Sequence, residues 1–209
     1  FSFEVQKGEK IAFISQDPLI ITTLFQIISG EIEPDSGSFK WGVTASHTYF
    51  PKDNNKYFET DKNLIDWLRQ YSVDQNINFL RGFLGKMLFT GEDSKKNANI
   101  LSGGERVRCM LSKMMLAEAN VLIFDEPTNH LDLESITALN NSLIDFNGTI
   151  LFTSQDYQFI QTVADRIIEI SPKGWINSHY KYDEYLACPD IQKRRENIYK
   201  NKNKIPVSH

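Results

Sequence analysis

The sequence predicts an α/β domain with a mainly parallel sheet flanked by helices, an antiparallel β edge and a helical sub-domain. Two apolar runs, at residues 121–124 and 149–153, have the composition of strands buried in a parallel sheet. A helical pattern follows each run, at residues 133–146 and 157–164. A strand at residues 166–170 that returns through Gly174 predicts the antiparallel edge, and two apolar helical patterns within residues 63–89 predict the sub-domain.

Length and composition limit the possible classes of protein. A chain of 209 residues with 41% hydrophobic content can bury one good-sized core, so we expect one domain with a small sub-domain. The net charge of -4 argues against a general attraction to nucleic acid or membranes, although it leaves room for a local basic patch. Cys109 and Cys188 lie far apart without metal-type spacing, which predicts two reduced thiols. No apolar stretch reaches the roughly eighteen residues of a membrane span, so we expect a soluble, cytoplasmic protein.

Two acidic residues end the first apolar run abruptly. Asp125 and Glu126 follow residues 121–124, and ligands of open α/β sheets bind outside the carboxyl ends of the strands. One carboxylate at such a strand end can hold Mg²⁺ while the other polarises an attacking water. The alternative is that both acids cap the following helix, but Asp132 already stands at the N-cap position of that helix.

A glycine-rich helix start lies just before this run. Ser102, Gly103, Gly104 and Glu105 precede an apolar periodic pattern, which predicts a helix whose free N–H groups and dipole can hold a phosphate. The alternative is an ordinary capping box, with Ser102 at the N-cap and Glu105 three residues later. The two interpretations are compatible, because a capped helix end can still present glycine N–H groups.

The remaining elements follow from periodicity and turn residues. Strands are expected at residues 1–5, 10–14 and 38–41. A short helix is expected at residues 183–186, and an amphipathic helix that includes residues 24–28 is expected to end at Gly30. Residues 90–99 are polar and without periodicity, which predicts a loop that delivers the glycine-rich helix. The aromatic residues within residues 63–89 favour core packing over a cofactor site.

We expect the domain to cover residues 1–189, with its helical sub-domain at about residues 60–100, followed by a basic tail at residues 190–209. Residues 193–204 hold six basic residues against the single acid Glu196. A frayed, solvated extension explains this composition, and contact with RNA is the more specific, functional alternative. The chain also starts without Met, which suggests a fragment of a longer protein.

Residues 101–105 (Leu-Ser-Gly-Gly-Glu), 125–132 (Asp-Glu-Pro-Thr-Asn-His-Leu-Asp) and 153–156 together resemble the ATP-binding cassette (ABC) superfamily of P-loop NTPases. These motif sequences are similar to those of the ABC-F family of soluble tandem-cassette proteins. In that family the signature usually ends in Glu, and the second Walker acid is followed by Pro-Thr-Asn-His-Leu-Asp. The resemblance spans roughly residues 3–187. It implies an ABC ATPase fold with ATP and Mg²⁺ as cofactors, with Ser102, Gly103, Gly104, Glu105 and Asp132 on the nucleotide side.

The phosphate loop departs from the family pattern. The motif G-x-x-x-x-G-K-[ST] falls on residues 15–22, Ser-Gln-Asp-Pro-Leu-Ile-Ile-Thr, so only the final hydroxyl residue remains. Pro18 has no N–H to donate, Ile21 replaces the lysine, and Asp17 adds a negative charge where an anion would lie. These changes all oppose ATP, so we expect a degenerate Walker A loop on a surviving strand-loop-helix scaffold.

The resemblance assigns the other site residues one by one. Thr22 and Thr23 are the part of the loop assigned to nucleotide, and Thr22 with Asp125 is assigned to Mg²⁺. Glu126 and Gln155 take the catalytic positions, although the family has histidine at residue 155 and Gln155 keeps only a neutral hydrogen bond. Lys52 stands in the Q-loop at residues 48–53, where it can bind phosphate but cannot ligate a cation, and a solvated loop lysine is the alternative.

The resemblance implies an ATPase whose nucleotide lies between the P-loop of one ABC domain and the signature of another. We therefore expect a second ABC domain as partner, in the same chain or in a dimer, and the short tail favours this chain as the second cassette. The ABC-F resemblance further implies action on the ribosome or its RNA, in translation regulation or antibiotic protection. A transporter's nucleotide-binding subunit and a non-enzymatic dimerisation or regulatory module are the alternatives.

Overall fold

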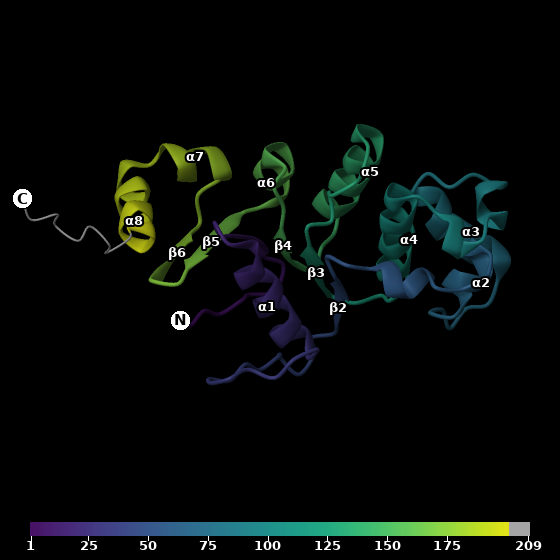
Figure 1. Cartoon of the computed structure of the whole chain (residues 1–209), viewed down its shortest axis with the longest axis horizontal. Helices are drawn as coiled ribbons and strands as arrows, with labels where there is room; N and C mark the ends of the chain where they lie inside the picture. Colours follow the sequence, from purple (N-terminus) through teal and green to yellow (C-terminus); the bar gives the residue numbers. More distant parts are fainter. Residues whose placement is uncertain (201–209) are drawn as a thin grey trace, which may run out of the picture.

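The computed structural model describes residues 1–200. Its centre is a six-stranded sheet in the order β2-β3-β4-β1-β5-β6 (Figure 1). Five strands are parallel neighbours and β6 pairs antiparallel to β5 at one edge. The strands are β1 (Lys10–Ile14), β2 (His47–Phe50), β3 (Val121–Asp125), β4 (Thr149–Thr153), β5 (Arg166–Ser171) and β6 (Gly174–Ser178). The predicted mainly parallel sheet with an antiparallel edge is confirmed.

Alternating side chains of the strands build two apolar layers, one on each face of the sheet. On one face, residues such as Ile11, Ile123 and Leu151 pack against helix α1 (Pro18–Ser29). On the other face, residues such as Phe124 and Phe152 pack against the helices α4 (Gly103–Leu116), α5 (Leu133–Ile144) and α6 (Tyr157–Val163). Both faces of the central strands are therefore covered, which is why their sequences read as continuous apolar runs.

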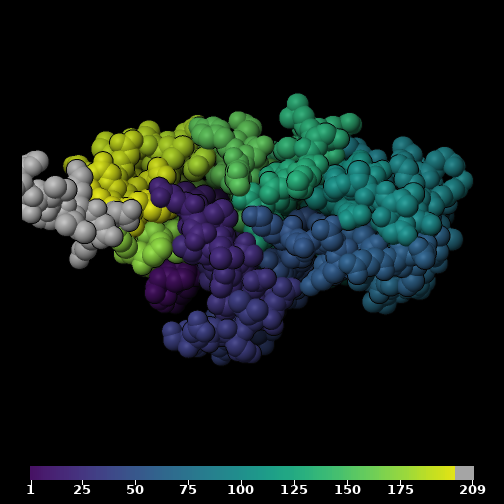
Figure 2. Space-filling view, viewed as in Figure 1, coloured from purple at the N-terminus to yellow at the C-terminus, as the bar shows by residue number. Residues whose placement is uncertain are grey.

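The helical sub-domain forms one end of the molecule (Figures 1 and 2). It contains α2 (Leu64–Arg69) and α3 (Ile77–Lys86), which pack on α4, with short 3-10 turns at Asn55–Phe58, Asp93–Lys95 and Ala98–Ile100. Trp67 is fully buried, its ring stacks on Phe58, and its indole N–H donates to the carbonyl of Tyr57 at 2.6 Å. Trp67 and Phe89 thus serve the core, as predicted, whereas Tyr71 and Phe79 are exposed.

Two predicted strands are absent from the described residues 1–200. Residues 1–5 pair with no strand there; instead Phe3 packs edge-on against Phe13 and the Glu4 carbonyl accepts a hydrogen bond from Arg166. Residues 38–41 also lie outside any strand, in a segment between α1 and β2 that projects from the molecule (Figure 2). Conversely, residues 48–50 of the expected Q-loop are part of strand β2. An alternating apolar pattern does not show whether a neighbouring strand is available for pairing, which explains the wrong strand predictions at residues 1–5 and 38–41.

The predicted frayed tail is wrong up to residue 199. The helices α7 (Tyr182–Ala187) and α8 (Pro189–Tyr199) pack near the β6 edge, and Ile191 is buried. Glu169 of β5 is buried and accepts hydrogen bonds from Arg195 of α8, at 2.8 Å, and from Tyr185 of α7. Arg195 thus serves internal packing rather than a solvated extension. Lys202 and Lys204 of the predicted tail lie outside the described residues.

Candidate functional site

The predicted site residues meet at the carboxyl edge of the sheet. Strands β3, β4 and β1 are parallel neighbours in that order, so the segments that follow them emerge side by side. These segments are Asp125–Glu126, residues 154–156 and residues 15–17. The buried hydroxyls of Thr128 and Ser154 hydrogen-bond at 2.8 Å and tie the first two segments together. The two acids emerge at the carboxyl edge of the sheet, as predicted, next to the segments that hold Gln155 and the altered loop.

Asp125 and Glu126 are buried carboxyl groups with unused oxygens. The exposed fractions of their side chains are 1% and 5%, and Asp125 Oδ2 and Glu126 Oε2 have no hydrogen-bond partner among the described residues. Burial raises the pKa of both carboxyl groups, because it penalises their charged forms. Glu126 also adopts a φ of 52°, which costs a non-glycine residue about 1–2 kcal/mol. Such backbone strain beside unpartnered anions is typical of a functional site.

Three neighbours surround these acids. Thr22 of α1 and Lys52 both lower the pKa of Asp125, which partly offsets the rise caused by burial. Lys52 and Gln155 act in the same way on Glu126. The Tyr49 hydroxyl is also buried without a hydrogen-bond partner in residues 1–200, and burial followed by the charge of Asp125 raises its pKa. The structure thus brings Thr22, Asp125, Glu126 and Gln155 together, while Lys52 is exposed and affects both acids only through its charge. Tyr49 was missed, and the metal, nucleotide and catalytic roles of the predicted residues stay predictions.

These oxygen donors suit Mg²⁺, because two free carboxylate oxygens beside a threonine hydroxyl are the hard ligands that this cation prefers. Asp125 and Thr22 would hold the ion, which when bound would neutralise negative charge next to Glu126. No cluster of three or more His, Cys, Asp or Glu side chains suited to a metal occurs in residues 1–200, so any such site depends on the threonine.

The loop before helix α1 uses part of its backbone donors in its own capping. Helix α1 begins at Pro18, and Asp17 is its N-cap, with Oδ1 accepting the Leu19 N–H at 3.0 Å. The Asp17 carbonyl accepts the Ile20 N–H at 3.2 Å, and Pro18 has no N–H. The Leu19 and Ile20 N–H groups are therefore already used, and a carboxylate lies at the helix end. Thr23 lies half-buried one residue beyond Thr22 in α1.

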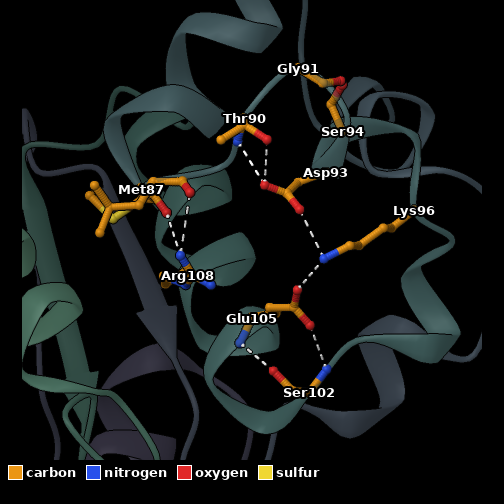
Figure 3. A network of polar contacts seen from close by, with 10 residues as sticks. Met87, Thr90, Gly91, Asp93, Ser94, Lys96, Ser102, Glu105 and Arg108 are labelled. Atoms are coloured by element: carbon orange, nitrogen blue, oxygen red, sulfur yellow. Dashed lines mark hydrogen bonds and ion pairs between the residues drawn. The ribbon is translucent and has the colours of Figure 1, made fainter.

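The glycine-rich start of α4 is a capping box, as one of the two interpretations predicted. Ser102 Oγ accepts the Glu105 N–H at 3.3 Å, and Glu105 Oε2 accepts the Ser102 N–H at 2.9 Å (Figure 3). Lys96 donates to Glu105 at 2.8 Å and pairs with Asp93 at 2.9 Å. Burial opposes the charge of Glu105, but the hydrogen bonds from Lys96 and Ser102 outweigh it and lower its pKa. Ser102 and Gly103 remain exposed, so the helix end stays accessible.

The start of α4 also contacts the segment that follows the Walker acids. A Cβ atom on Gly104 would lie 2.9 Å from the carbonyl oxygen of His130, whereas one on Gly103 would lie 3.6 Å from the His130 side chain. His130 has a φ of 66°, so this turn is tightly shaped. Neither the contact of Lys96 nor that of His130 was predicted from the sequence, because both depend on how the loops on either side of α4 fold against its first turn.

Asp132 caps the next helix. Its Oδ1 accepts the Ser135 N–H at 2.8 Å at the start of α5, and the hydrogen bonds with Ser135 lower its pKa. The predicted capping role is confirmed, and the nucleotide role of this residue stays a prediction.

This fold and these motifs define the nucleotide-binding domain of an ABC protein. Residues 1–129 match the family model described as ABC transporter, and the chain belongs to this family. It is 64% identical to the uncharacterized ABC transporter ATP-binding protein YkpA of Bacillus subtilis over 95% of this chain and 37% of that protein. It is 30% identical to ABC transporter F family member 2 of Arabidopsis thaliana, over 87% of this chain and 27% of that protein.

The fold is also similar to solved ABC structures. A chain from the complex of the archaeal ribosomal stalk protein aP1 and the ribosome recycling factor aABCE1 matches with a TM-score of 0.73, at 21% identity. That match covers 92% of this chain and 43% of the other, and it shows the fold alone. The present chain spans about a third of the length of its first curated relatives, at 37%, 36% and 30%. No helix in residues 1–200 is long and apolar enough to cross a membrane.

Proposed function

We propose that this chain is the second cassette of a cytoplasmic ABC-F ATPase and that its signature completes the ATP site of a partner ABC domain. One contrast carries this proposal. Both helix ends are exposed, but α4 is capped by the Ser102 hydroxyl, which can also donate, whereas α1 is capped by the Asp17 carboxylate and begins with Pro18, which has no N–H. A phosphate can approach the first helix end and is repelled at the second. The chain's own P-loop site is accordingly degenerate, and its contribution to catalysis is made in trans.

In the partner's site the residues of α4 act by binding and orientation. The Ser102 hydroxyl and the N–H groups at the helix start donate toward phosphate oxygens, and the helix dipole favours their negative charge. Glu105, held by Lys96 and Ser102, fixes the first turn in place. In the chain's own half-site, Glu126 and Gln155 keep the position of a water-orienting pair but lack a phosphate cradle beside them.

The degenerate site makes a direct prediction about nucleotide affinity. We expect the 209-residue chain alone to bind ATP with Mg²⁺ more weakly than about 1 mM, because the loop lacks the lysine, Pro18 has no N–H, and Asp17 engages the N–H groups of Leu19 and Ile20. Calorimetric titration of the chain with ATP measures this affinity. Micromolar binding would contradict the degenerate-site proposal. Restoring glycines and lysine in residues 15–21 should raise the affinity; no gain would mean that the surrounding fold blocks the site.

The ribosome as target rests on the ABC-F resemblance, which agrees with the name of the relative ABC transporter F family member 2. It would place the full-length protein in translation regulation or antibiotic protection, with its nucleotide state switching binding to the ribosome. The net charge of -4 gives no general attraction to RNA, so contact would depend on local patches such as Lys193 and Arg194 of α8.

A Ser102→Arg variant of the full-length protein tests the role in trans. The long cation fills the helix start where the partner's phosphate would approach, so we expect ATP turnover to fall at least about tenfold. The same variant should lose the ATP dependence of its co-sedimentation with ribosomes. Ser112→Ala, in the buried middle of the same helix, is a control that should keep turnover. Unchanged turnover in Ser102→Arg would refute the proposal that the signature acts in trans.

A transporter subunit is the second candidate, favoured by the words ABC transporter ATP-binding protein in the name of a relative. Co-purification of the full-length protein with a membrane protein, rather than with ribosomes, would support it. A non-enzymatic dimerisation module would be supported if no nucleotide bound in any complex.

A further inference from the structure

The signature helix carries a carboxylate at the end where the partner's phosphate would approach. Glu105 lies in the first turn of α4, and its Oε2 atom accepts the Ser102 N–H at 2.9 Å. The Glu105 side chain is only 19% exposed, so solvent ions screen its charge incompletely. Burial opposes this charge, but the hydrogen bonds from Lys96 and Ser102 outweigh burial and lower the pKa of Glu105. Without a counter-charge, this carboxylate would repel a phosphate that approaches Ser102.

Lys96 brings a positive charge to the other oxygen of this carboxylate. Its ammonium group donates to Glu105 Oε1 at 2.8 Å and pairs with Asp93 at 2.9 Å. Asp93 is itself fixed, because its Oδ2 atom accepts the Thr90 N–H at 3.0 Å and the Thr90 hydroxyl at 2.7 Å. Figure 3 shows this chain of contacts from Thr90 down to Ser102. Two carboxylates therefore hold the ammonium group in place beside the start of α4.

The start of α1 lacks such a counter-charge. Asp17 caps it with a carboxylate, yet none of the ion pairs within residues 1–200 involves Asp17. Both helices thus carry an acid at the N-terminal end, but only the acid of α4 is paired with a cation. This difference agrees with a start of α1 that repels phosphate and a start of α4 that accepts it.

We propose that Lys96 is a positioning residue of the signature, whose ammonium group cancels the charge of Glu105 so that a phosphate of the partner's ATP can approach the start of α4. Lys96 acts through Glu105 and does not touch the nucleotide. This inference rests on the proposal that the signature acts in trans. It adds the reason why a helix end with an acid in its first turn still receives an anion.

The test is the steady-state kinetics of ATP hydrolysis by the full-length protein. Lys96→Met should raise the KM for ATP about tenfold and leave kcat within about twofold of wild type, because the uncovered charge repels the phosphates before and during the reaction alike. A displaced signature would instead lower kcat. Lys96→Arg keeps the charge and should stay within about threefold of the wild-type KM. Lys96→Gln can donate a hydrogen bond but carries no charge, so it should behave as Lys96→Met.

A second background locates the effect at Glu105. Glutamine can replace glutamate at this position of a capping box, and Glu105→Gln removes the charge that Lys96 cancels. Adding Lys96→Met to Glu105→Gln should therefore change the KM by less than about twofold. Any effect of Glu105→Gln itself is divided out, because both proteins in this comparison carry it.

Lys95→Met is the matched control from the same turn. Lys95 pairs with Glu92 at 2.7 Å, with both side chains more than half exposed, and has no ion pair with α4 in the described residues. Its loss should leave both the KM and kcat as in wild type. Urea unfolding of the 209-residue chain checks folding, and Lys96→Met should unfold close to the wild-type midpoint because Lys96 is exposed.

The proposal is overturned by an unchanged KM in Lys96→Met, by a fall in kcat in place of the rise in KM, or by an equal rise in KM when Lys96→Met is added to Glu105→Gln. Failure of both Lys96→Met and Lys96→Gln to fold would also overturn it, since the role would then be structural. If Ser102→Arg lowers turnover but Lys96→Met does not raise the KM, only this inference fails. If Ser102→Arg leaves turnover unchanged, the role in trans fails and this inference falls with it.

Discussion

Substituting Gly104 by alanine should lower the free energy of unfolding by about 2 kcal/mol, because the new methyl group would lie 2.9 Å from the carbonyl oxygen of His130. The obstacle is backbone rather than a flexible side chain, so either α4 or the segment around His130 must shift. If the signature acts in trans as proposed, this shift displaces it from the nucleotide of the partner domain in the full-length protein. A displacement of about 1 Å can cost about 100-fold in rate, and we expect ATP turnover to fall by that order.

Gly103→Ala is the matched control, since its added methyl group would lie 3.6 Å from the His130 side chain, an ordinary contact. Alanine also favours a helix over glycine, so this variant should be as stable as wild type or slightly more stable. Urea unfolding of both variants of the chain measures the stability, and steady-state ATP hydrolysis of the full-length protein measures the turnover. Equal stability of the two variants would show that the start of α4 does not depend on its close approach to His130.

The predicted elements that proved correct are those whose sequence reports burial on both faces. Strand β1 coincides with the predicted residues 10–14 and β4 with residues 149–153, because continuous apolar runs are typical of strands between two helical layers. Residues 1–5 and 38–41 carry weaker alternating patterns, which fit a strand but do not say whether a partner strand is available. The same limit applies to residues 189–199, whose polar composition hid a helix fixed by only a few contacts, such as Ile191 and Arg195.

The candidate site was predictable where it depends on strand ends and motif positions. Asp125, Glu126 and Gln155 come together because parallel neighbouring strands end at one edge, which topology alone ensures. Sequence spacing could not reveal the contact of Gly104 with His130, or the bond between Lys96 and Glu105, since these depend on how the sub-domain and the loops pack. The sequence shows directly that residues 15–21 lack a lysine and glycines, whereas only the structure shows that Asp17 caps the start of α1.

Replacing Glu169 by alanine should lower the free energy of unfolding by about 3 kcal/mol. Glu169 is buried in β5 and joins two helices to the sheet, through Arg195 of α8 at 2.8 Å and the buried hydroxyl of Tyr185 of α7. Removing one partner of a buried pair leaves an uncompensated charge, which typically costs 3–5 kcal/mol, and the Tyr185 hydroxyl also loses its acceptor. We take the lower end, because the Arg195 side chain is 33% exposed and water can replace part of the interaction.

The loss should be concentrated at the β6 edge of the molecule, which urea unfolding and hydrogen exchange can distinguish together. Urea unfolding gives the total change, and amide exchange should become faster in α7 and α8 before it does in β1, β3 or β4. Glu196→Ala is the control, since Glu196 pairs with Lys200 at 3.6 Å with both side chains about two-thirds exposed, and it should change stability by less than about 0.5 kcal/mol. If Glu169→Ala changed stability as little as Glu196→Ala, the buried pair would not be what fastens α8. In that case apolar packing of Ile191 and Ile198, with the hydrogen bond from the Ser171 hydroxyl to the Ile198 carbonyl at 2.7 Å, would have to hold the helix.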